Sequence, residues 1–582
     1  MHASGFIPDL RNTNSLWASV LAETLVRCGV RHAVVAPGSR STPLTLALAA
    51  HPAIEAIPVL DERSAAFFAL GLAKPRMQPV ALVCTSGTAA ANFFPAVIEA
   101  RESGVPLLVL TADRPPELRA CASGQTIDQQ KLYGDYVNFY HELALPDVAE
   151  GLLRYLRQSV AHAVGRTMAP HPGAVHLNIP FRDPLAPLAD GGVAERAGAG
   201  IDWELFFSHL APTVPALLQG AMPRISPDVH GAIVVGPAQP ADVESFVAAA
   251  GEIARRLGWP VLADGLSPVR NHAKQFPHLV TTYDIILRND TAAERLKPEV
   301  VLCLGGWPTS KVLRAWLEGS GAAIWLATER ADNRDALHGR TTTLAVSLPV
   351  LAAALPEALD VNGYQRMWTR YEEKTRPALD ARLRGEGGWF EPKAAWLLGR
   401  HLPVGTPFYI ANSMPVRDVE YVWSAGDRAI RPLCNRGGNG IDGTLSSALG
   451  TAHAAELPAV LLTGDLALLH DTNGFLLRGK FRGSLTVVLI NNRGGGIFEH
   501  LPIAQFEPPF EEFFATPQDA DFAKLCAAYG VEHVLVRDWA HFMDLIMKLP
   551  PAGLRVLELK TDRKKDAAQR KALFAELAAG LG

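Results

Sequence analysis

Cysteine is scarce in this chain of 582 residues, which contains six cysteines and no CxxC pair. Several of the six stand inside apolar runs. This pattern argues against a disulfide framework or a cysteine zinc site, and it favours free thiols in a reducing compartment. The first fifteen residues also lack the basic-then-apolar design of a secretory signal. We therefore expect a cytoplasmic protein.

Long hydrophobic runs and an excess of one charge are missing as well. No window holds 18 uninterrupted apolar residues, so we expect no integral membrane segment. The formal net charge is only −4, which gives no reason to expect a nucleic-acid partner. Any anion must then be bound by Arg and Lys side chains that are placed locally.

Strand-like and helix-like patterns alternate along three stretches, and no short-period repeat is present. This alternation predicts an α/β protein with three doubly wound parallel-sheet domains, at 1–185, 200–355 and 385–582. A Gly/Ala/Pro-rich segment at 185–200 is expected to be an irregular linker, and 363–385 a long helix. The predicted strands are 32–36, 57–60, 80–84, 106–110, 232–235, 261–263, 300–304, 323–326, 408–410, 458–463, 485–490 and 555–559.

Two polar residues close successive predicted strands of the third stretch. Asp465 follows the strand 458–463, and Asn492 follows 485–490. The 25 residues 466 to 490, between the pairs Gly464-Asp465 and Asn491-Asn492, fit one strand–helix–strand step, so both side chains should meet at the carboxyl edge of the sheet. A carboxylate and a carboxamide oxygen there suit a hard cation such as Mg²⁺ that holds a diphosphate. Ordinary loop chemistry produces the same short signals, so alone they leave both interpretations open.

The glycine-rich run after Asn492 extends this candidate site. Three glycines, 494–496, allow the backbone to approach a ligand that side chains would block. The carbonyl of Gly494 is a candidate third metal ligand. Ile497 and Phe498 come next and are expected to form an apolar wall.

Glu62 stands between a predicted strand and an apolar helix. An acid at a helix start is favoured by the helix dipole, which explains most such residues. The following residues, 65–69, are small and apolar and suit close packing. A diphosphate held by a metal in this way is the anchoring pattern of thiamine-diphosphate enzymes. In their chemistry, a carboxyl group bonded to N1′ of the cofactor's aminopyrimidine ring promotes the imino tautomer, which then removes the C2 proton of the thiazolium ring. Glu62 is the candidate for that group.

Arginines recur where predicted strands end. Arg40, Arg114, Arg417 and Arg436 all occupy such positions. Each could be a solvated surface residue or half of an ion pair. Four at sheet edges in a chain of net negative charge indicate a pocket for a polyanionic small molecule, because Arg matches carboxylates bidentately.

Together these segments resemble the 2-succinyl-5-enolpyruvyl-6-hydroxy-3-cyclohexene-1-carboxylate synthases, thiamine-diphosphate enzymes of menaquinone biosynthesis. Leu466 replaces the last Gly of the general Gly-Asp-Gly thiamine motif, as is usual in this family. The resemblance implies a pyrimidine-binding first domain, a central domain without nucleotide cofactor and a diphosphate-binding third domain. It rests on APGSRSTPL (36–44), DERSAAFFALG (61–71), TSGTAAANFFPAVIEA (85–100), LTADRPPEL (110–118), GGWPTSK (305–311), NSMPVRD (412–418), NRGGNGIDG (435–443) and GDLALLHD (464–471).

The resemblance also implies an activity and residue roles. Such enzymes decarboxylate 2-oxoglutarate on thiamine diphosphate with Mg²⁺, or Mn²⁺, and add the succinyl carbanion equivalent 1,4 to isochorismate. Cofactor contacts would come from Glu62, Ser413, Ile441, Asp465 and Asn492, with Asp465, Asn492 and Gly494 on the metal. Substrate contacts would come from Ser39, Arg40, Arg114, Gln125, Lys311, Ser413, Arg417, Arg436, Ile497 and Phe498.

Some of these roles stay open. Ile441 would wedge under the bent cofactor, but an ordinary core Ile at a helix start fits the sequence equally well. The chain departs from its relatives at Gly124, where Asn is expected, and at Val312, where some relatives carry Arg. These departures put the binding of substrate carboxylates near Gln125 and Lys311 in doubt.

The resemblance implies a homodimer or homotetramer in which Glu62 and Asp465 of different subunits serve one cofactor, so a monomer should be inactive. A related thiamine enzyme, such as an acetohydroxyacid synthase or a decarboxylase, is the nearest alternative. A Rossmann-type oxidoreductase is disfavoured because no G-x-G-x-x-G follows an early strand. A catalytically inactive paralogue is the non-enzyme alternative, and intact Glu62, Asp465 and Asn492 count against it.

Overall fold

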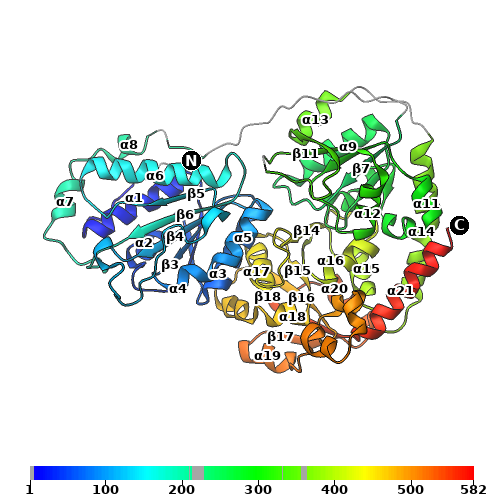
Figure 1. Cartoon of the computed structure of the whole chain (residues 1–582). Helices are drawn as coiled ribbons and strands as arrows, with labels where there is room; N and C mark the ends of the chain where they lie inside the picture. Colours follow the sequence, from blue (N-terminus) through cyan, green and yellow to red (C-terminus); the bar gives the residue numbers. More distant parts are fainter. Residues whose placement is uncertain (1–5, 209, 213–228, 331, 356–362, 582) are drawn as a thin grey trace.

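The computed structural model describes residues 6–208, 210–212, 229–330, 332–355 and 363–581 (Figure 1). Within this part of the chain, the strands form three six-stranded sheets, A, B and C. Every neighbouring pair of strands is parallel. The predicted class, α/β with three parallel sheets, is confirmed. We call the parts of the chain that carry these sheets the first, central and third units.

Sheets A and C have the same strand order. In sheet A it is β2-β1-β3-β4-β6-β5, and in sheet C β14-β13-β15-β16-β18-β17. Sheet A contains β1 His32–Val35, β2 Glu55–Pro58, β3 Val80–Cys84, β4 Leu107–Asp113, β5 Phe139–Glu142 and β6 Ala174–Pro180. Sheet C contains β13 Pro407–Ile410, β14 Arg431–Cys434, β15 Ala459–Gly464, β16 Ser484–Asn491, β17 Glu532–Leu535 and β18 Gly553–Lys560.

Sheet B has the order β12-β11-β10-β7-β8-β9. Its strands are β7 Gly231–Val235, β8 Val261–Ala263, β9 Leu279–Val280, β10 Val300–Leu304, β11 Ala323–Thr328 and β12 Arg340–Ala345. Each strand predicted from the sequence overlaps a strand of the structure. The strands that the sequence analysis did not predict are β5, β6, β9, β12, β14 and β17. All but β6 are edge strands. The strands β5, β12 and β17 are half-exposed and mixed in sequence, and β9 and β14 are only two and four residues long, so none shows the long apolar run of a strand buried on both faces.

Helices cover both faces of the sheets. The first unit has α1 Thr13–Arg27, α2 Thr42–Ala50, α3 Glu62–Ala73, α4 Thr88–Asn92, α5 Phe94–Ser103, α6 Glu150–Met168, α7 Val193–Gly198 and α8 Trp203–Phe206. The central unit has α9 Val243–Leu257, α10 Tyr283–Ile286, α11 Asp290–Arg295, α12 Lys311–Ser320, α13 Leu348–Ala354 and the expected long helix, α14 Tyr364–Gly385. The third unit has α15 Glu391–His401, α16 Met414–Val422, α17 Thr444–Ala454, α18 Asp465–Leu469, α19 Phe522–Tyr529, α20 Trp539–Met547 and α21 Arg563–Ala579.

The segment 185–200 is not irregular throughout, as the sequence had suggested. Its residues 193–198 form α7, and Ala194 of this helix is buried in the core of the first unit. That core continues to Phe206 and Phe207, because this aromatic pair packs against it. Among the described residues, no helix is both long enough and apolar enough to cross a bilayer.

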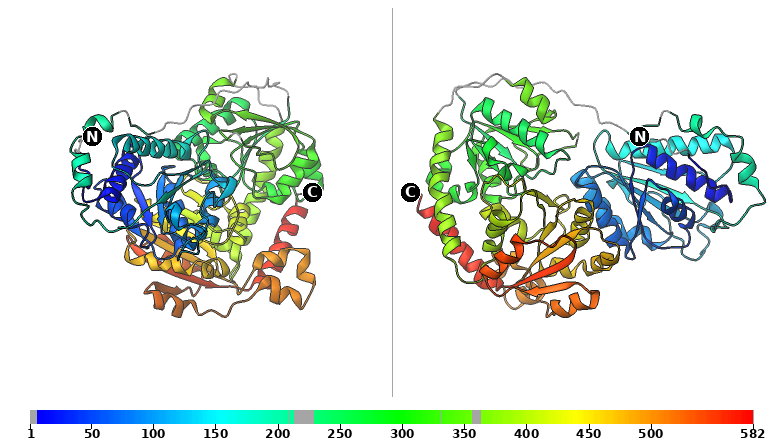
Figure 2. Two further views of the ribbon diagram at one scale, coloured as in Figure 1. Left: turned by 60° about the vertical axis from the view of Figure 1, so that its left-hand side comes forward. Right: turned by 180° about the vertical axis from the view of Figure 1, so that it is seen from behind.

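Helices α3 and α17 join the first unit to the third, as the views in Figures 1 and 2 show from several sides. A Cβ on Gly71 of α3 would lie 2.1 Å from the carbonyl oxygen of Ser447, and one on Gly450 of α17 would lie 2.2 Å from that of Phe68. The helix backbones therefore touch where these glycines cross. One hydrophobic core consequently runs from sheet A through both helices to sheet C.

Candidate active site

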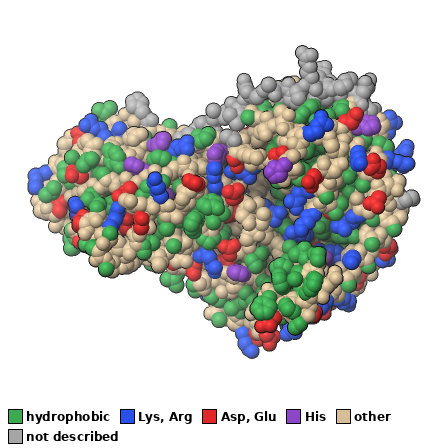
Figure 3. Space-filling view, viewed as in Figure 1, with side chains coloured by type: hydrophobic (Ala, Val, Ile, Leu, Met, Phe, Trp, Pro, Cys, Tyr) green, Lys and Arg blue, Asp and Glu red, His purple; other side chains and the backbone are tan. Residues whose placement is uncertain are grey.

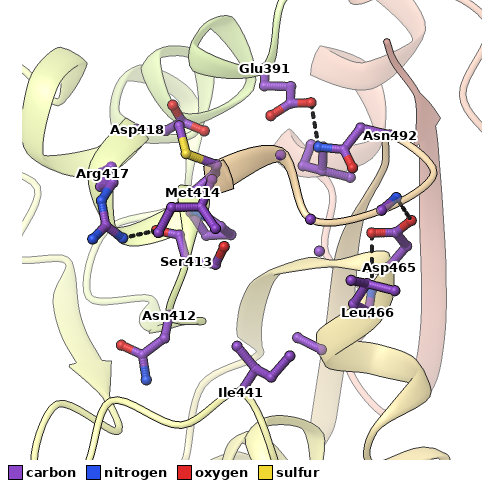
Figure 4. A pocket seen from close by; sticks show the side chains of 18 of the residues that line it. Glu391, Asn412, Ser413, Met414, Arg417, Asp418, Ile441, Asp465, Leu466 and Asn492 are labelled. Carbon is purple, nitrogen blue, oxygen red and sulfur yellow. Dashed lines mark hydrogen bonds between the residues drawn. The ribbon is translucent and has the colours of Figure 1, made fainter. Parts of the chain in front are cut away.

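A cavity of about 290 Å³ lies at the carboxyl edge of sheet C. The loops that follow β13, β14, β15 and β16 form it, as expected for the carboxyl ends of parallel strands. Its lining includes Glu391, Asn412, Ser413, Met414, Arg417, Asp418, Arg436, Ile441, Asp465, Leu466, Asn492, Gly494, Ile497 and Phe498. The residues predicted for the diphosphate half of the site thus share one pocket (Figure 4).

Asp465 begins α18 directly after β15, and its carboxylate is held by backbone N–H groups. Oδ1 accepts from the N–H of Leu466 at 2.9 Å, and Oδ2 accepts from the N–H of Gly494 at 2.8 Å. Burial raises the pKa of Asp465 to about 6, and these N–H donors oppose that rise. The carboxylate is fixed in place before any ligand binds.

Asn492 presents a free acceptor to the same pocket. Its Nδ2 donates to Oε1 of Glu391 at 2.8 Å, whereas its Oδ1 is buried and has no hydrogen-bond partner (Figure 4). A buried acceptor without a partner is costly unless a ligand completes it. This orphaned oxygen fits a bound cation.

Gly494 adopts a conformation that other residues rarely reach. Its φ is +135°, and a Cβ at this position would lie 2.3 Å from the carbonyl oxygen of Ala515. Its own carbonyl accepts one hydrogen bond, from the N–H of Gly496 at 2.9 Å, which leaves a second lone pair for a metal. Glycine is therefore required where the backbone passes the pocket.

The oxygens of Asp465, Asn492 and Gly494 form a set suited to a hard cation. Mg²⁺ typically takes few protein ligands and completes its shell with water and substrate phosphates. No cluster of three or more His, Cys, Asp or Glu side chains that could hold a metal occurs in the described ranges. The residues present thus fit a diphosphate-bound Mg²⁺ better than an all-protein metal cage.

Two arginines supply positive charge on the opposite wall. Arg417 donates through Nη1 to the carbonyl of Ser413 at 2.5 Å, and Arg436 donates through Nη1 to Oδ1 of Asn412 at 3.0 Å. Burial lowers the pKa of Arg417, and the nearby cations Arg436 and Arg314 lower it further. In Figure 3, Lys and Arg side chains gather around a hollow in this half of the molecule, next to a group of apolar side chains.

The position of Arg417 differs from the sequence prediction. It lies in the first turn of α16 and not at a strand end, because Met414 already starts the helix. Arg114 does follow its strand directly, and Arg436 stands two residues after β14. Arg417 reaches the pocket because its helix begins at the sheet edge.

A second group of predicted substrate residues belongs to the carboxyl edge of sheet A. We call this group, Ser39, Arg40, Arg114 and Gln125, the first-unit cluster. Arg114 donates to Oγ of Ser86 at 2.8 Å and to the carbonyl of Gly124 at 3.0 Å, and Gln125 donates to the carbonyl of Ser86 at 3.0 Å. Arg40 is buried and donates to the carbonyl of Phe181 at 2.9 Å, while Ser39 is exposed. Burial and the neighbouring Arg114 lower the pKa of Arg40.

The structure does not bring the first-unit cluster or Glu62 to the pocket of the same chain. In the described residues, the cavity lining comes from the third unit alone. Glu62 is the first residue of α3, and its neighbours contact the third unit elsewhere: Arg63 donates to the carbonyl of His470 at 2.6 Å, and Ser64 to Oδ1 of Asp471 at 3.2 Å. Lys311, exposed at the start of α12, is also absent from the lining.

Two residues that act on pocket residues, Glu391 and Arg314, were not predicted from the sequence. Glu391 starts α15 about a hundred positions before Asn492, and no local pattern marks their contact. Arg314 stands one helical turn after Lys311, so helical spacing could have indicated that both face one side of α12. Its charge contributes to lowering the pKa of Arg417, although Arg314 does not itself line the cavity.

Sequence comparison matches three segments of the chain to thiamine pyrophosphate (thiamine diphosphate) enzymes. Residues 17–132 match the "Thiamine pyrophosphate enzyme, N-terminal TPP binding domain", 224–403 the "Middle domain of thiamine pyrophosphate" and 421–553 the "Thiamine pyrophosphate enzyme, C-terminal TPP binding domain". Benzoylformate decarboxylase from Polynucleobacter necessarius has a similar fold, with a TM-score of 0.68, 15% identity and coverage of 94% of this chain and 98% of that one. The fold and site define a thiamine-diphosphate enzyme.

Curated relatives show to which family of thiamine-diphosphate enzymes the chain belongs. Proteins called 2-succinyl-5-enolpyruvyl-6-hydroxy-3-cyclohexene-1-carboxylate synthase match almost end to end. The protein of Trichormus variabilis is 54% identical, covering 98% of this chain and 98% of the relative, and that of Microcystis aeruginosa is 53% identical, covering 95% and 97%. The chain belongs to the 2-succinyl-5-enolpyruvyl-6-hydroxy-3-cyclohexene-1-carboxylate synthase family.

Proposed function

We propose that the chain is a transferase that decarboxylates 2-oxoglutarate on thiamine diphosphate and adds the succinyl carbanion equivalent 1,4 to isochorismate. The products are 2-succinyl-5-enolpyruvyl-6-hydroxy-3-cyclohexene-1-carboxylate and CO₂, in menaquinone biosynthesis. The observation that carries the proposal is the identity above 50% along nearly the whole chain with synthases of this name. An acetohydroxyacid synthase, the nearest alternative, is not favoured by these relatives.

The pocket of sheet C holds the cofactor in this proposal. When bound, thiamine diphosphate supplies an acidic C2 carbon that can attack a 2-oxo acid and stabilise the carbanion left by loss of CO₂. Asp465, Asn492 and the carbonyl of Gly494 hold Mg²⁺, or Mn²⁺, against the diphosphate. Ile441 and Ser413 contact the rest of the cofactor, and the orphaned oxygen of Asn492 supports the metal role.

Positive side chains bind the carboxylates of both substrates. 2-Oxoglutarate is a dicarboxylate and isochorismate carries two carboxylates as well, so a decarboxylase of small monoacids would need fewer cations. Arg417 and Arg436 line the pocket itself, beside the apolar Ile497 and Phe498. Ser39, Arg40, Arg114, Gln125 and Lys311 complete the substrate site from outside it.

A second subunit brings Glu62 and the first-unit cluster to the pocket. Their absence from the pocket lining of their own chain supports a homodimer or homotetramer whose active sites combine sheet A of one subunit with sheet C of another. Glu62 then holds the proton at N1′ of the aminopyrimidine. A cytoplasmic location belongs to the same proposal, and the six free thiols, five of them buried, are compatible with a reducing compartment.

The direct test is incubation of the protein with thiamine diphosphate, Mg²⁺, 2-oxoglutarate and isochorismate. Mass spectrometry should then detect the succinyl adduct, which should disappear when either substrate is left out. Pyruvate alone serves as the comparison substrate. Formation of acetolactate from pyruvate without any adduct from 2-oxoglutarate and isochorismate would assign the chain to the acetohydroxyacid synthase reaction.

A further inference from the structure

Two adjacent asparagines at the end of β16 each donate a hydrogen bond to a buried glutamate, and the two glutamates are different residues. Asn491 donates through Nδ2 to Oε1 of the buried Glu558 at 2.6 Å, and Asn492 donates through Nδ2 to Oε1 of the buried Glu391 at 2.8 Å. The carboxamide oxygens of the two asparagines differ in their hydrogen-bond partners. Oδ1 of Asn491 accepts from the N–H of Arg493 at 3.3 Å, whereas Oδ1 of Asn492 has no partner. Of the two, only Asn492 lines the pocket.

A carboxamide is directional, because one end only donates and the other only accepts. Rotation of the Asn492 amide by half a turn would turn its oxygen toward Oε1 of Glu391, an acceptor, and its NH₂ toward the candidate metal site. Both changes are unfavourable. The orientation that Glu391 selects is therefore the one in which Oδ1 faces the pocket.

Glu391 is itself held firmly enough to act as such a selector. Its Oε1 also accepts from Oγ1 of Thr561 at 2.9 Å, and its backbone N–H donates to Oδ1 of Asp566 at 2.8 Å. Arg570 lies 3.9 Å from Oε2 and pairs with Asp566 at 2.6 Å and with Asp418. The pocket wall thus contains a buried charge network whose end is the amide of Asn492.

The protonation state of Glu391 does not remove this acceptor. Burial, Asp566 and Asp418 raise the pKa of Glu391 to about 8, and Arg570 opposes the rise. An oxygen that already accepts from both Asn492 and Thr561 remains an acceptor when a proton sits on the other oxygen, Oε2.

We propose that Glu391 is a positioning residue that orients the Asn492 carboxamide oxygen toward the pocket and so sets the affinity for the divalent cation. The inference rests on the metal site of the proposed function. It assigns no contact between Glu391 and the cation, cofactor or substrates. Partners that orient metal ligands typically change metal affinity about 10- to 100-fold when they are removed.

The test compares two pairs of variants of the full-length protein. Glu391→Leu removes the acceptor at similar volume, and Glu391→Gln keeps an acceptor oxygen. Glu558→Leu and Glu558→Gln make the same changes at the Asn491 contact, outside the pocket. The Kd for Mn²⁺ is measured by electron paramagnetic resonance with thiamine diphosphate present, and thermal unfolding reports the fold.

We expect Glu391→Leu to weaken Mn²⁺ binding about 10- to 100-fold and Glu391→Gln to restore most of the affinity. Both Glu558 variants should lower the melting temperature at most, with an unchanged Kd. A folded Glu391→Leu variant with the wild-type Kd overturns the proposal, as does an equal loss in Glu558→Leu. If Glu391→Leu does not fold, Thr561→Val replaces it, since it removes the second anchor of Oε1; an unchanged Kd there also overturns the proposal.

These outcomes separate the inference from the function on which it rests. If the wild-type protein binds no Mn²⁺ with thiamine diphosphate, the proposed metal site fails. If it binds Mn²⁺ and the Glu391 variants bind equally well, the positioning role alone fails.

Discussion

Sheets A and C have one topology and use their carboxyl edges differently. The loop after β2 leads to Glu62 at the start of α3, and the corresponding loop after β14 carries Arg436. The loop after β4 carries Arg114, and that after β16 carries Asn492. Identical strand order brings corresponding loops together in both sheets. Topology thus decides which loops gather, and side chains decide what the gathered loops bind.

The two edges differ in how complete they are within one chain. At sheet C, loops surround a cavity into which a buried oxygen of Asn492 points without a partner. At sheet A, Arg114 and Gln125 find partners in neighbouring loops, on Ser86 and Gly124. The edge of sheet C encloses a cavity within one chain, whereas in the proposed assembly the edge of sheet A supplies side chains to a cavity of another subunit.

The largest expected effect comes from the acid at the edge of sheet A. Glu62→Gln should lower turnover on the order of a thousandfold, because the amide cannot hold the proton at N1′. Thiamine diphosphate and Mg²⁺ should still bind, since the pocket of sheet C is intact. Exchange of the C2 proton for deuterium, followed by NMR, should slow in parallel. Wild-type exchange in the folded variant would remove Glu62 from this role.

Mixed subunits test whether the two edges meet between chains. Glu62→Gln and Asp465→Ala should each be nearly inactive alone. Coexpressed in equal amounts, half of the dimers are mixed and each has one intact site of two, so activity should return to about a quarter of wild type. No recovery, despite mixed dimers detected by native mass spectrometry, would mean that each chain builds its own site.

The contact between α3 of the first unit and α17 of the third unit, within one chain, should respond to pH. Asp471 accepts from Ser446 of α17 and Ser64 of α3, and burial raises its pKa from 3.8 to about 6. The folded state then binds more protons than the unfolded state, so this group's contribution to stability falls as pH rises from about 4 to 6, by up to roughly 3 kcal/mol.

Asp471→Asn should remove that part of the pH dependence, because an amide does not titrate. Thermal unfolding of both proteins at pH 4 and pH 7 gives the comparison. The difference in melting temperature between the two pH values should shift toward higher stability at pH 7 in the variant. Parallel pH profiles would show that Asp471 contributes no such proton linkage.

The smallest expected effect concerns the backbone of the pocket. Gly494→Ala places a Cβ against the carbonyl of Ala515 in a strained conformation, which should cost about 1–3 kcal/mol of stability. Binding of Mn²⁺ should weaken about tenfold as the loop shifts. Gly479→Ala is the control, since no atom lies within 4 Å of its Cβ position. Equal behaviour of the two variants would contradict a special requirement at 494.

The sequence predicted the buried strands well, and with them the residues that directly follow strand ends. Asp465 and Asn492 share a pocket because the parallel β15 and β16 end at one edge. Edge strands such as β12 and β17 were not given in advance, because their mixed sequences resemble loops. Arg417 was assigned to a strand end although it lies in α16, since helix starts are poorly marked in sequence.

Local pattern therefore determined the fold class and the placement of Asp465 and Asn492 at one sheet edge, because strand periodicity and the strand–helix–strand step are properties of short segments. The tertiary structure decided the rest. It brought Glu391 into hydrogen-bond contact with Asn492 and Arg314 near enough to Arg417 to lower its pKa, and it left Glu62 outside the pocket of its own chain. Such relations depend on which distant segments pack together, and no spacing within one segment encodes them.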